Sequence, residues 1–208
     1  MIEEEAEPEP RGKSKIIGIT GGIGSGKSTV SKLIEEAGYP VYYSDIRAKN
    51  IVNDHPQLQQ QIKEILGPNS YDDNGFYDRK YVSEMVFNNN ELLLKLNSLI
   101  HPAVKIDFED WVAQQTAGFV FKETALLFEL KLNESCYKSL LVTADDNSRL
   151  KRVMDRDNKT YREVESIMLK QMPEKDKVKL ADYIIFNNDG LEELEAETKK
   201  ILTEITAL

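Results

Sequence analysis

The residues best suited to chemistry form a glycine-rich segment near the start of the chain, Gly21-Gly-Ile-Gly-Ser-Gly-Lys-Ser28. It fills the pattern G-x-x-x-x-G-K-[ST], in which glycines let the main chain curl with its N–H groups pointing inward. Phosphate oxygens accept hydrogen bonds from such N–H groups at the positive end of the following helix. Lys27 adds a charge for the β- and γ-phosphates, and the Ser28 hydroxyl can bind Mg²⁺. We interpret the segment as a phosphate-binding loop, which kinases, GTPases and mechanical ATPases share.

Such a loop needs a strand before it and a helix after it, and the sequence predicts both. Apolar residues over 15–20 indicate a buried strand, and the spacing i, i+3, i+4, i+7 over 27–37 indicates a helix. A short strand over 40–43 and a helix capped by Ser44 follow. Strands joined through a helix run parallel and end at one edge of the sheet, where ligands bind, so Asp45 is a candidate for the region of the terminal phosphate. An aspartate there could equally serve only the helix dipole.

The middle of the chain, residues 53–118, shows helical apolar spacing and no strand pattern, which predicts an inserted helical lobe for the phosphate acceptor. His101-Pro102 is expected to interrupt its last helical run, and a lone histidine before proline is more often structural than catalytic. Glu123 ends the next strand at the edge of the loop, where an acid commonly assists Mg²⁺ through water. The remaining strands are predicted over 119–123, 140–143 and 183–186.

A helix opening near residue 146 carries three arginines at spacings of three and four, which place them on one face. Such a face is usually solvated, but guanidinium groups without an acid among them could also contact a triphosphate. A second helix begins at the capping box of Thr160 and Glu163, and the pair of helices resembles a mobile lid. The arginines are Arg149, Arg152 and Arg156.

Composition narrows the class of protein. The chain has 208 residues, 40% hydrophobic and 30% charged, which is typical of one soluble globular domain. Its formal net charge of −9 argues against a broad nucleic-acid-binding face. It has no apolar run near the roughly 20 residues that span a bilayer, and a single cysteine, Cys136, suits a reducing compartment. We therefore expect a cytoplasmic protein, with residues 1–14 forming a disordered acidic tail.

Together these features resemble the dephospho-coenzyme A kinase family, which completes coenzyme A synthesis, over residues 15–208. The resemblance rests on an ordered set of short motifs more than on the loop alone. They are Ile19 to Ser28, Ser44-Asp45-Ile46, Leu99-Ile-His-Pro-Ala103, Leu126-Leu-Phe-Glu129, Arg152 to Asp157, Gln171-Met-Pro173 and Ala181 to Asn187.

The resemblance implies an α/β fold of the P-loop NTPase type, with three layers (α/β/α) and a five-stranded parallel sheet. The chain would form one kinase domain over 15–208, with a helical substrate lobe and a helical lid inserted into its core. These parts are the core over 15–52, 119–145 and 181–208, the lobe over 53–118 and the lid over 146–180.

The implied reaction transfers the γ-phosphoryl group of ATP to the ribose 3′-hydroxyl of dephospho-coenzyme A, with Mg²⁺ held partly by Ser28. Asp45 matches the acid that accepts the hydroxyl proton, Lys27 and Arg156 match residues that stabilise the transferred group, and Arg79 and His101 lie in the acceptor lobe. No nucleic acid or membrane partner is implied, and we expect a monomer or weak homo-oligomer. ATP binding is expected at Gly22, Ile23, Gly24, Ser25, Gly26, Lys27, Ser28, Thr29, Arg152 and Asn187.

Two positions depart from the family pattern: Tyr43 stands where a second acid is common, and Ala125 where many members have proline. Another small-molecule kinase of the same fold, acting on a nucleotide or sugar, is an alternative. A GTP-dependent switch is a second, but Asn158-Lys-Thr-Tyr161 lacks the final aspartate of the guanine-reading motif N-K-x-D. A scaffold that has lost catalysis is a third alternative, but the intact Lys27, Ser28 and Asp45 argue against it.

Overall fold

The computed structural model describes residues 14–87 and 89–207 of the chain, so most of the expected acidic tail lies outside the described residues. The contacts within the chain define two compact units. The first contains the described residues up to Tyr42 and those from Gln114 onward, and the second is Tyr43–Ala113. None of the helices within the described residues is long and apolar enough to cross a membrane.

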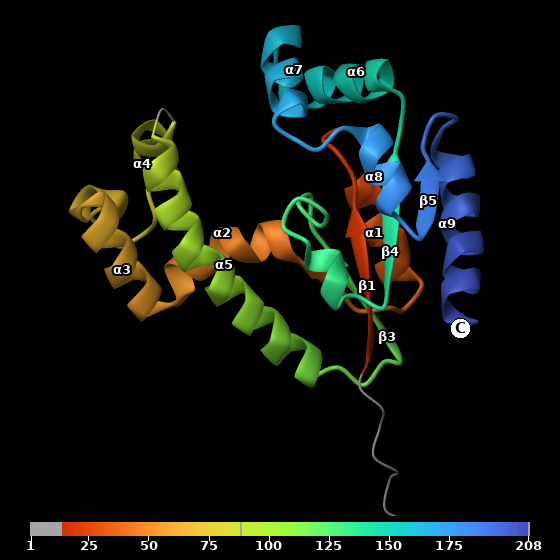
Figure 1. Cartoon of the computed structure of the whole chain (residues 1–208), viewed down its shortest axis with the longest axis horizontal. Helices are drawn as coiled ribbons and strands as arrows, with labels where there is room; N and C mark the ends of the chain where they lie inside the picture. The colour runs from red at the N-terminus through yellow and green to blue at the C-terminus, as the bar shows by residue number, and fades with distance from the viewer. Residues whose placement is uncertain (1–13, 88, 208) are drawn as a thin grey trace, which may run out of the picture. The chain divides into compact units, whose positions relative to one another are not determined.

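A five-stranded sheet with the strand order β2-β3-β1-β4-β5 lies at the centre of the first unit (Figure 1). The parallel pairs β1–β3, β1–β4 and β4–β5 confirm the predicted parallel sheet. The last four residues of the central strand β1, 17–20, are all buried, and because successive side chains point to opposite faces, this strand is covered on both faces. The strands are β1 (Lys15–Thr20), β2 (Val41–Tyr43), β3 (Phe119–Glu123), β4 (Lys138–Thr143) and β5 (Tyr183–Phe186).

Helices cover the sheet and complete the predicted three-layer fold. Helix α1 (Lys27–Glu36) packs beside α9 (Leu191–Thr206), and these two helices contact β1, β4 and β5 (Figure 1). Helix α8 (Glu174–Leu180) contacts β4, and the short helix η2 (Leu132–Ser135) contacts β1. Helices α1 and α9 are amphipathic, and their buried apolar residues, which include Ile34 and Ile205, pack on the sheet.

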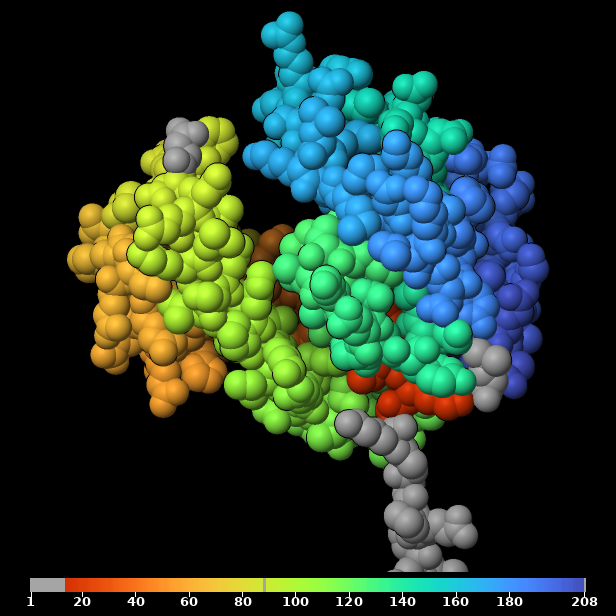
Figure 2. Space-filling model, in the orientation of Figure 1, coloured from red at the N-terminus to blue at the C-terminus, as the bar shows by residue number. Residues whose placement is uncertain are grey.

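The segment predicted to form a lid contains α6 (Asp146–Asp157), α7 (Tyr161–Leu169) and α8. The capping box is confirmed: the Thr160 hydroxyl accepts a hydrogen bond from the Glu163 N–H, and the Glu163 carboxylate accepts one from the Thr160 N–H. In the space-filling view, these teal to light-blue residues form one contiguous surface (Figure 2).

The second unit is helical around its own apolar core, to which Ile62 and Val82 contribute. It begins at Tyr43, earlier than the lobe predicted over 53–118, because α2 packs on α3 and α5. Its elements are α2 (Ser44–Asp54), α3 (Pro56–Leu66), the short helix η1 (Pro68–Ser70), α4 (Arg79–Val86) and α5 (Asn90–Ala113).

Two local predictions in this unit are wrong. The N-cap of α2 is Tyr43, whose side chain makes no capping hydrogen bond, so Ser44 belongs to the first helical turn instead of capping it. Helix α5 also continues through Pro102 without interruption. Proline removes one backbone hydrogen bond, but packing of this long helix on α2, α3 and α4 offsets that loss.

Candidate active site

The phosphate-binding loop connects the end of β1 at Thr20 to the start of α1 at Lys27. Gly24 and Gly26 have φ angles of +79° and +98°, in the left-handed region that favours glycine. A Cβ atom on Gly26 would also collide with the Asn187 side-chain amide. Gly26 is the N-cap of α1 and has no side chain with which to cap it, so the first N–H groups of this helix form the kind of helix end that binds anions.

Lys27 forms an ion pair with Glu123, the last residue of β3. The two side chains are only 11% and 5% exposed, respectively. The pair therefore neutralises a lysine charge that is held beside the loop and largely shielded from water. Glu123, which the sequence predicts to assist Mg²⁺, therefore lies next to Lys27, which the sequence predicts to bind phosphate.

Two of the predicted ATP-binding residues outside the loop brace its carbonyl groups. The Asn187 amide nitrogen donates a hydrogen bond to the Ser25 carbonyl at 2.9 Å, and Arg152 Nη2 donates to the Asn187 carbonyl at 2.9 Å. Arg152 Nη1 also lies 3.5 Å from the Gly24 carbonyl oxygen. The structure thus brings Arg152 and Asn187 to the loop through its backbone, and their contact with ATP stays a prediction.

The three arginines of α6 have different environments, although their spacing places them on one helix face. Arg149 is 3% exposed, and its Nε donates a hydrogen bond to the Ile23 carbonyl at 3.1 Å. Arg156 is mostly exposed and forms two hydrogen bonds with Asp157, at 2.7 and 2.8 Å. These bonds raise the pKa of Arg156 and lower that of Asp157. Arg149 is therefore part of the loop's support, whereas Arg156 can reach a ligand.

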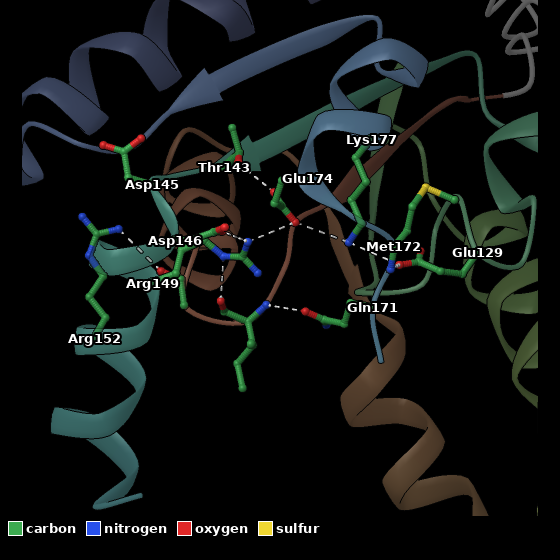
Figure 3. A network of polar contacts seen from close by, with 12 residues as sticks. Glu129, Thr143, Asp145, Asp146, Arg149, Arg152, Gln171, Met172, Glu174 and Lys177 are labelled. Carbon is green, nitrogen blue, oxygen red and sulfur yellow. Dashed lines mark hydrogen bonds and ion pairs between the residues drawn. The ribbon is translucent and has the colours of Figure 1, made fainter. Parts of the chain in front are cut away.

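A largely buried network of charges behind the loop was not predicted from the sequence (Figure 3). Glu174 lies 3.6 Å from both Arg149 and Lys177, and Lys177 lies 3.3 Å from Glu129. The Thr143 hydroxyl at the end of β4 donates to Glu174 at 2.6 Å. The only local signal is the i, i+3 spacing of Glu174 and Lys177. The network joins α6, α8 and the segment after β3.

Replacing Lys177 with methionine is expected to lower the free energy of unfolding by about 2–3 kcal/mol, because Glu129, only 18% exposed, would lose its cation and Glu174 would keep only Arg149. Lys177 is fully buried, whereas Lys179 on the same helix is 71% exposed and pairs with Asp176. The matched variant Lys179→Met should leave stability nearly unchanged. Urea denaturation of both variants measures the difference, and equal midpoints would contradict the structural role of Lys177.

The remaining predicted site residues belong to the second unit. Asp45 lies in the first turn of α2, and Arg79 begins α4 and donates a hydrogen bond from Nη2 to the Lys49 carbonyl at 3.2 Å. Arg79 thereby joins α4 to α2. His101 lies on α5 with an exposed side chain, although neighbouring groups desolvate the ring enough to lower its pKa below 6.5. A neutral imidazole is therefore favoured at neutral pH.

Comparisons with known proteins agree with this geometry. The family model for dephospho-CoA kinases matches residues 15–193. A dephospho-CoA kinase from Fusobacterium nucleatum is 40% identical over 179 residues, which cover 86% of this chain and 92% of that protein.

Two solved structures are similar over most of their length. The crystal structure of TT1252 from Thermus thermophilus has a TM-score of 0.81 at 35% identity, covering 92% of this chain and 97% of the other. A dephospho-CoA kinase from Campylobacter jejuni has a TM-score of 0.68 at 26% identity, covering 91% and 96%. With the phosphate-binding loop and the parallel sheet in place, this chain therefore belongs to the dephospho-CoA kinase family.

Proposed function

We propose that this chain transfers the γ-phosphoryl group of ATP to the ribose 3′-hydroxyl of dephospho-CoA, giving coenzyme A and ADP. The observation that carries the proposal is the phosphate-binding loop, with its left-handed glycines, uncapped helix end and Lys27, in a chain that matches the family model over residues 15–193. A cytoplasmic location and a monomeric or weakly associating state belong to the same proposal and rest on the sequence.

Lys27 and Ser28 are the residues proposed to act on the phosphates. Lys27 Nζ is held by Glu123, and a lysine on a flexible stem can turn from that carboxylate to phosphate oxygens. The Ser28 hydroxyl is exposed in the first turn of α1, and it is the hard oxygen ligand that Mg²⁺ prefers. Mg²⁺ held there would neutralise charge on the phosphate oxygens. Glu123 could assist that ion through water.

Asp45 is proposed to orient the acceptor hydroxyl and take its proton. Phosphoryl transfer has a loose transition state, so the protein contributes alignment and charge more than covalent chemistry. Arg156 is proposed to supply positive charge to the transferred group. Its present partner Asp157 is its neighbour in the chain, and exposed ion pairs contribute little to stability, so exchange for a phosphate costs little.

Helices α6 to α8 are proposed to act as a lid that excludes water from the reacting groups. Arg152 and Arg156 lie on α6, so this segment would add positive charge to that of Lys27 at the nucleotide. The expected consequence is slow ATP hydrolysis when no acceptor is present. ATP hydrolysis at the rate of phosphoryl transfer would contradict the lid.

An assay of ADP release with ATP and Mg²⁺ tests the proposed function. The acceptors to compare are dephospho-CoA, AMP, dTMP, shikimate, gluconate and none, with GTP replacing ATP in a parallel series. We expect turnover only with dephospho-CoA and a preference for ATP. Turnover with another acceptor would contradict the proposed substrate, and a preference for GTP with no acceptor dependence would favour a nucleotide switch.

A further inference from the structure

The peptide groups on both sides of Ile23, within the phosphate-binding loop, are held by side chains from elsewhere in the chain. The Ile23 N–H donates a hydrogen bond to Gln171 Oε1 at 2.9 Å. The Ile23 carbonyl accepts one from Arg149 Nε at 3.1 Å. Gln171 lies in the connection between α7 and α8, and Arg149 lies on α6, so two separate segments of the first unit hold a single loop residue.

The Arg149 side chain and the backbone next to Gln171 both contact the same largely buried network (Figure 3). The residue after Gln171, Met172, donates its N–H to Glu129 Oε1 at 3.1 Å. Glu129 pairs with Lys177, and Lys177 pairs with Glu174. Glu174 pairs with Arg149, whose side chain binds the Ile23 carbonyl. The contacts close a ring that begins and ends at one loop residue.

The ring matters because the loop is rich in glycine. Glycine has more conformational freedom to lose than any other residue, and ordering a loop when a ligand binds weakens the binding. Gly24, which follows Ile23, is in the left-handed region and lies so close to the Arg149 backbone that a Cβ would clash. The Ser25 N–H in turn donates to the Gly22 carbonyl at 3.1 Å, so fixing the Ile23 peptide fixes the turn that leads to the N–H groups at the start of α1.

We propose that Gln171 is a positioning residue of the phosphate-binding loop, which holds the Ile23 N–H so that the following loop N–H groups are aimed at nucleotide phosphates before the nucleotide binds. The inference rests on the proposed function only in taking a nucleoside triphosphate as the ligand of the loop. Gln171 acts through the loop backbone.

The test compares two variants at Gln171 with a control. Gln171→Met removes the acceptor oxygen and nearly keeps the length of the side chain, whereas Gln171→Glu keeps an acceptor oxygen. Gln60→Met makes the same change at an exposed glutamine of α3. Two quantities are measured without acceptor substrate: hydrogen exchange of the Ile23 amide by NMR, and the dissociation constant of ATP by calorimetry.

We expect Gln171→Met to speed exchange of the Ile23 amide at least about tenfold and to weaken ATP binding about five- to tenfold, the effect of one lost hydrogen bond. Exchange at Val30, whose N–H is bound to the Gly26 carbonyl, should not change. Gln171→Glu should restore protection of the Ile23 amide, and Gln60→Met should match the wild type.

The proposal is overturned if Gln171→Met leaves Ile23 exchange and ATP binding at wild-type values. It is also overturned if Ile23 and Val30 exchange faster by the same factor, because that result means general destabilisation of the fold. The proposed function can fail separately. A chain that binds ATP and responds to Gln171→Met as expected, yet does not phosphorylate dephospho-CoA, would refute the substrate and keep the positioning role.

Discussion

Asp45→Asn is expected to lower kcat for the phosphorylation of dephospho-CoA by about 10²- to 10⁴-fold, the usual contribution of a general base. Asparagine has nearly the same shape as aspartate, so α2 should fold as before, but its amide cannot accept the proton of the ribose hydroxyl. The measurement is steady-state kcat at saturating ATP and acceptor, together with the thermal unfolding midpoint. The midpoint should stay close to that of the wild type.

Asp54→Asn provides the matched control, because it removes the same charge from the same helix. Asp54 ends α2, is 60% exposed, and lies 3.9 Å from Arg47. Its replacement should change kcat by less than about twofold, as for most surface substitutions. Near-native turnover by Asp45→Asn would remove Asp45 from the proposed role. An equal loss in both variants would mean that the charge of the helix, and not a proton acceptor, is what matters.

Lys27→Met should affect both activity and stability. Loss of a charge that stabilises the transferred phosphoryl group is expected to lower kcat by about 10²- to 10³-fold. Glu123 would also lose its partner while its side chain is only 5% exposed, which is expected to cost about 3–5 kcal/mol of unfolding free energy. Steady-state kinetics and urea denaturation measure the two effects separately.

The double variant Lys27→Met/Glu123→Gln separates the two roles of the lysine. Removing the carboxylate charge together with the ammonium leaves no uncompensated ion, so much of the stability should return. Turnover should stay low, because neither change restores the positive charge that Lys27 would supply to the phosphates. Recovery of turnover in proportion to stability would show that Lys27 acts only through the fold.

Features governed by short-range rules were predictable from the sequence. The G-x-x-x-x-G-K-[ST] pattern identified the loop, and the bounds predicted for β1, β3 and β5 are those observed. The capping box at Thr160 was equally predictable, because its two hydrogen bonds join residues three apart. The assignment of the chain to its family likewise needed only the order of the short motifs.

Features that depend on packing were not predictable. By the local rule a helix should end before Pro102, but α5 continues through it because α5 packs on three other helices. Helical spacing placed Arg149 and Arg156 on one face, yet it cannot say how deep each side chain lies. Glu129 and Lys177 are far apart in the chain, so no pattern of sequence reveals their pairing.

The position of the new phosphate on the product tests the central claim most directly. The product of a reaction with ATP, Mg²⁺ and dephospho-CoA would be purified and examined by phosphorus and proton NMR. We predict one new phosphomonoester, whose phosphorus couples to the ribose H3′, formed in equal amount to ADP. A phosphate on the 2′-hydroxyl or on the pantetheine arm, or ADP with free phosphate and unchanged acceptor, would contradict the proposed reaction.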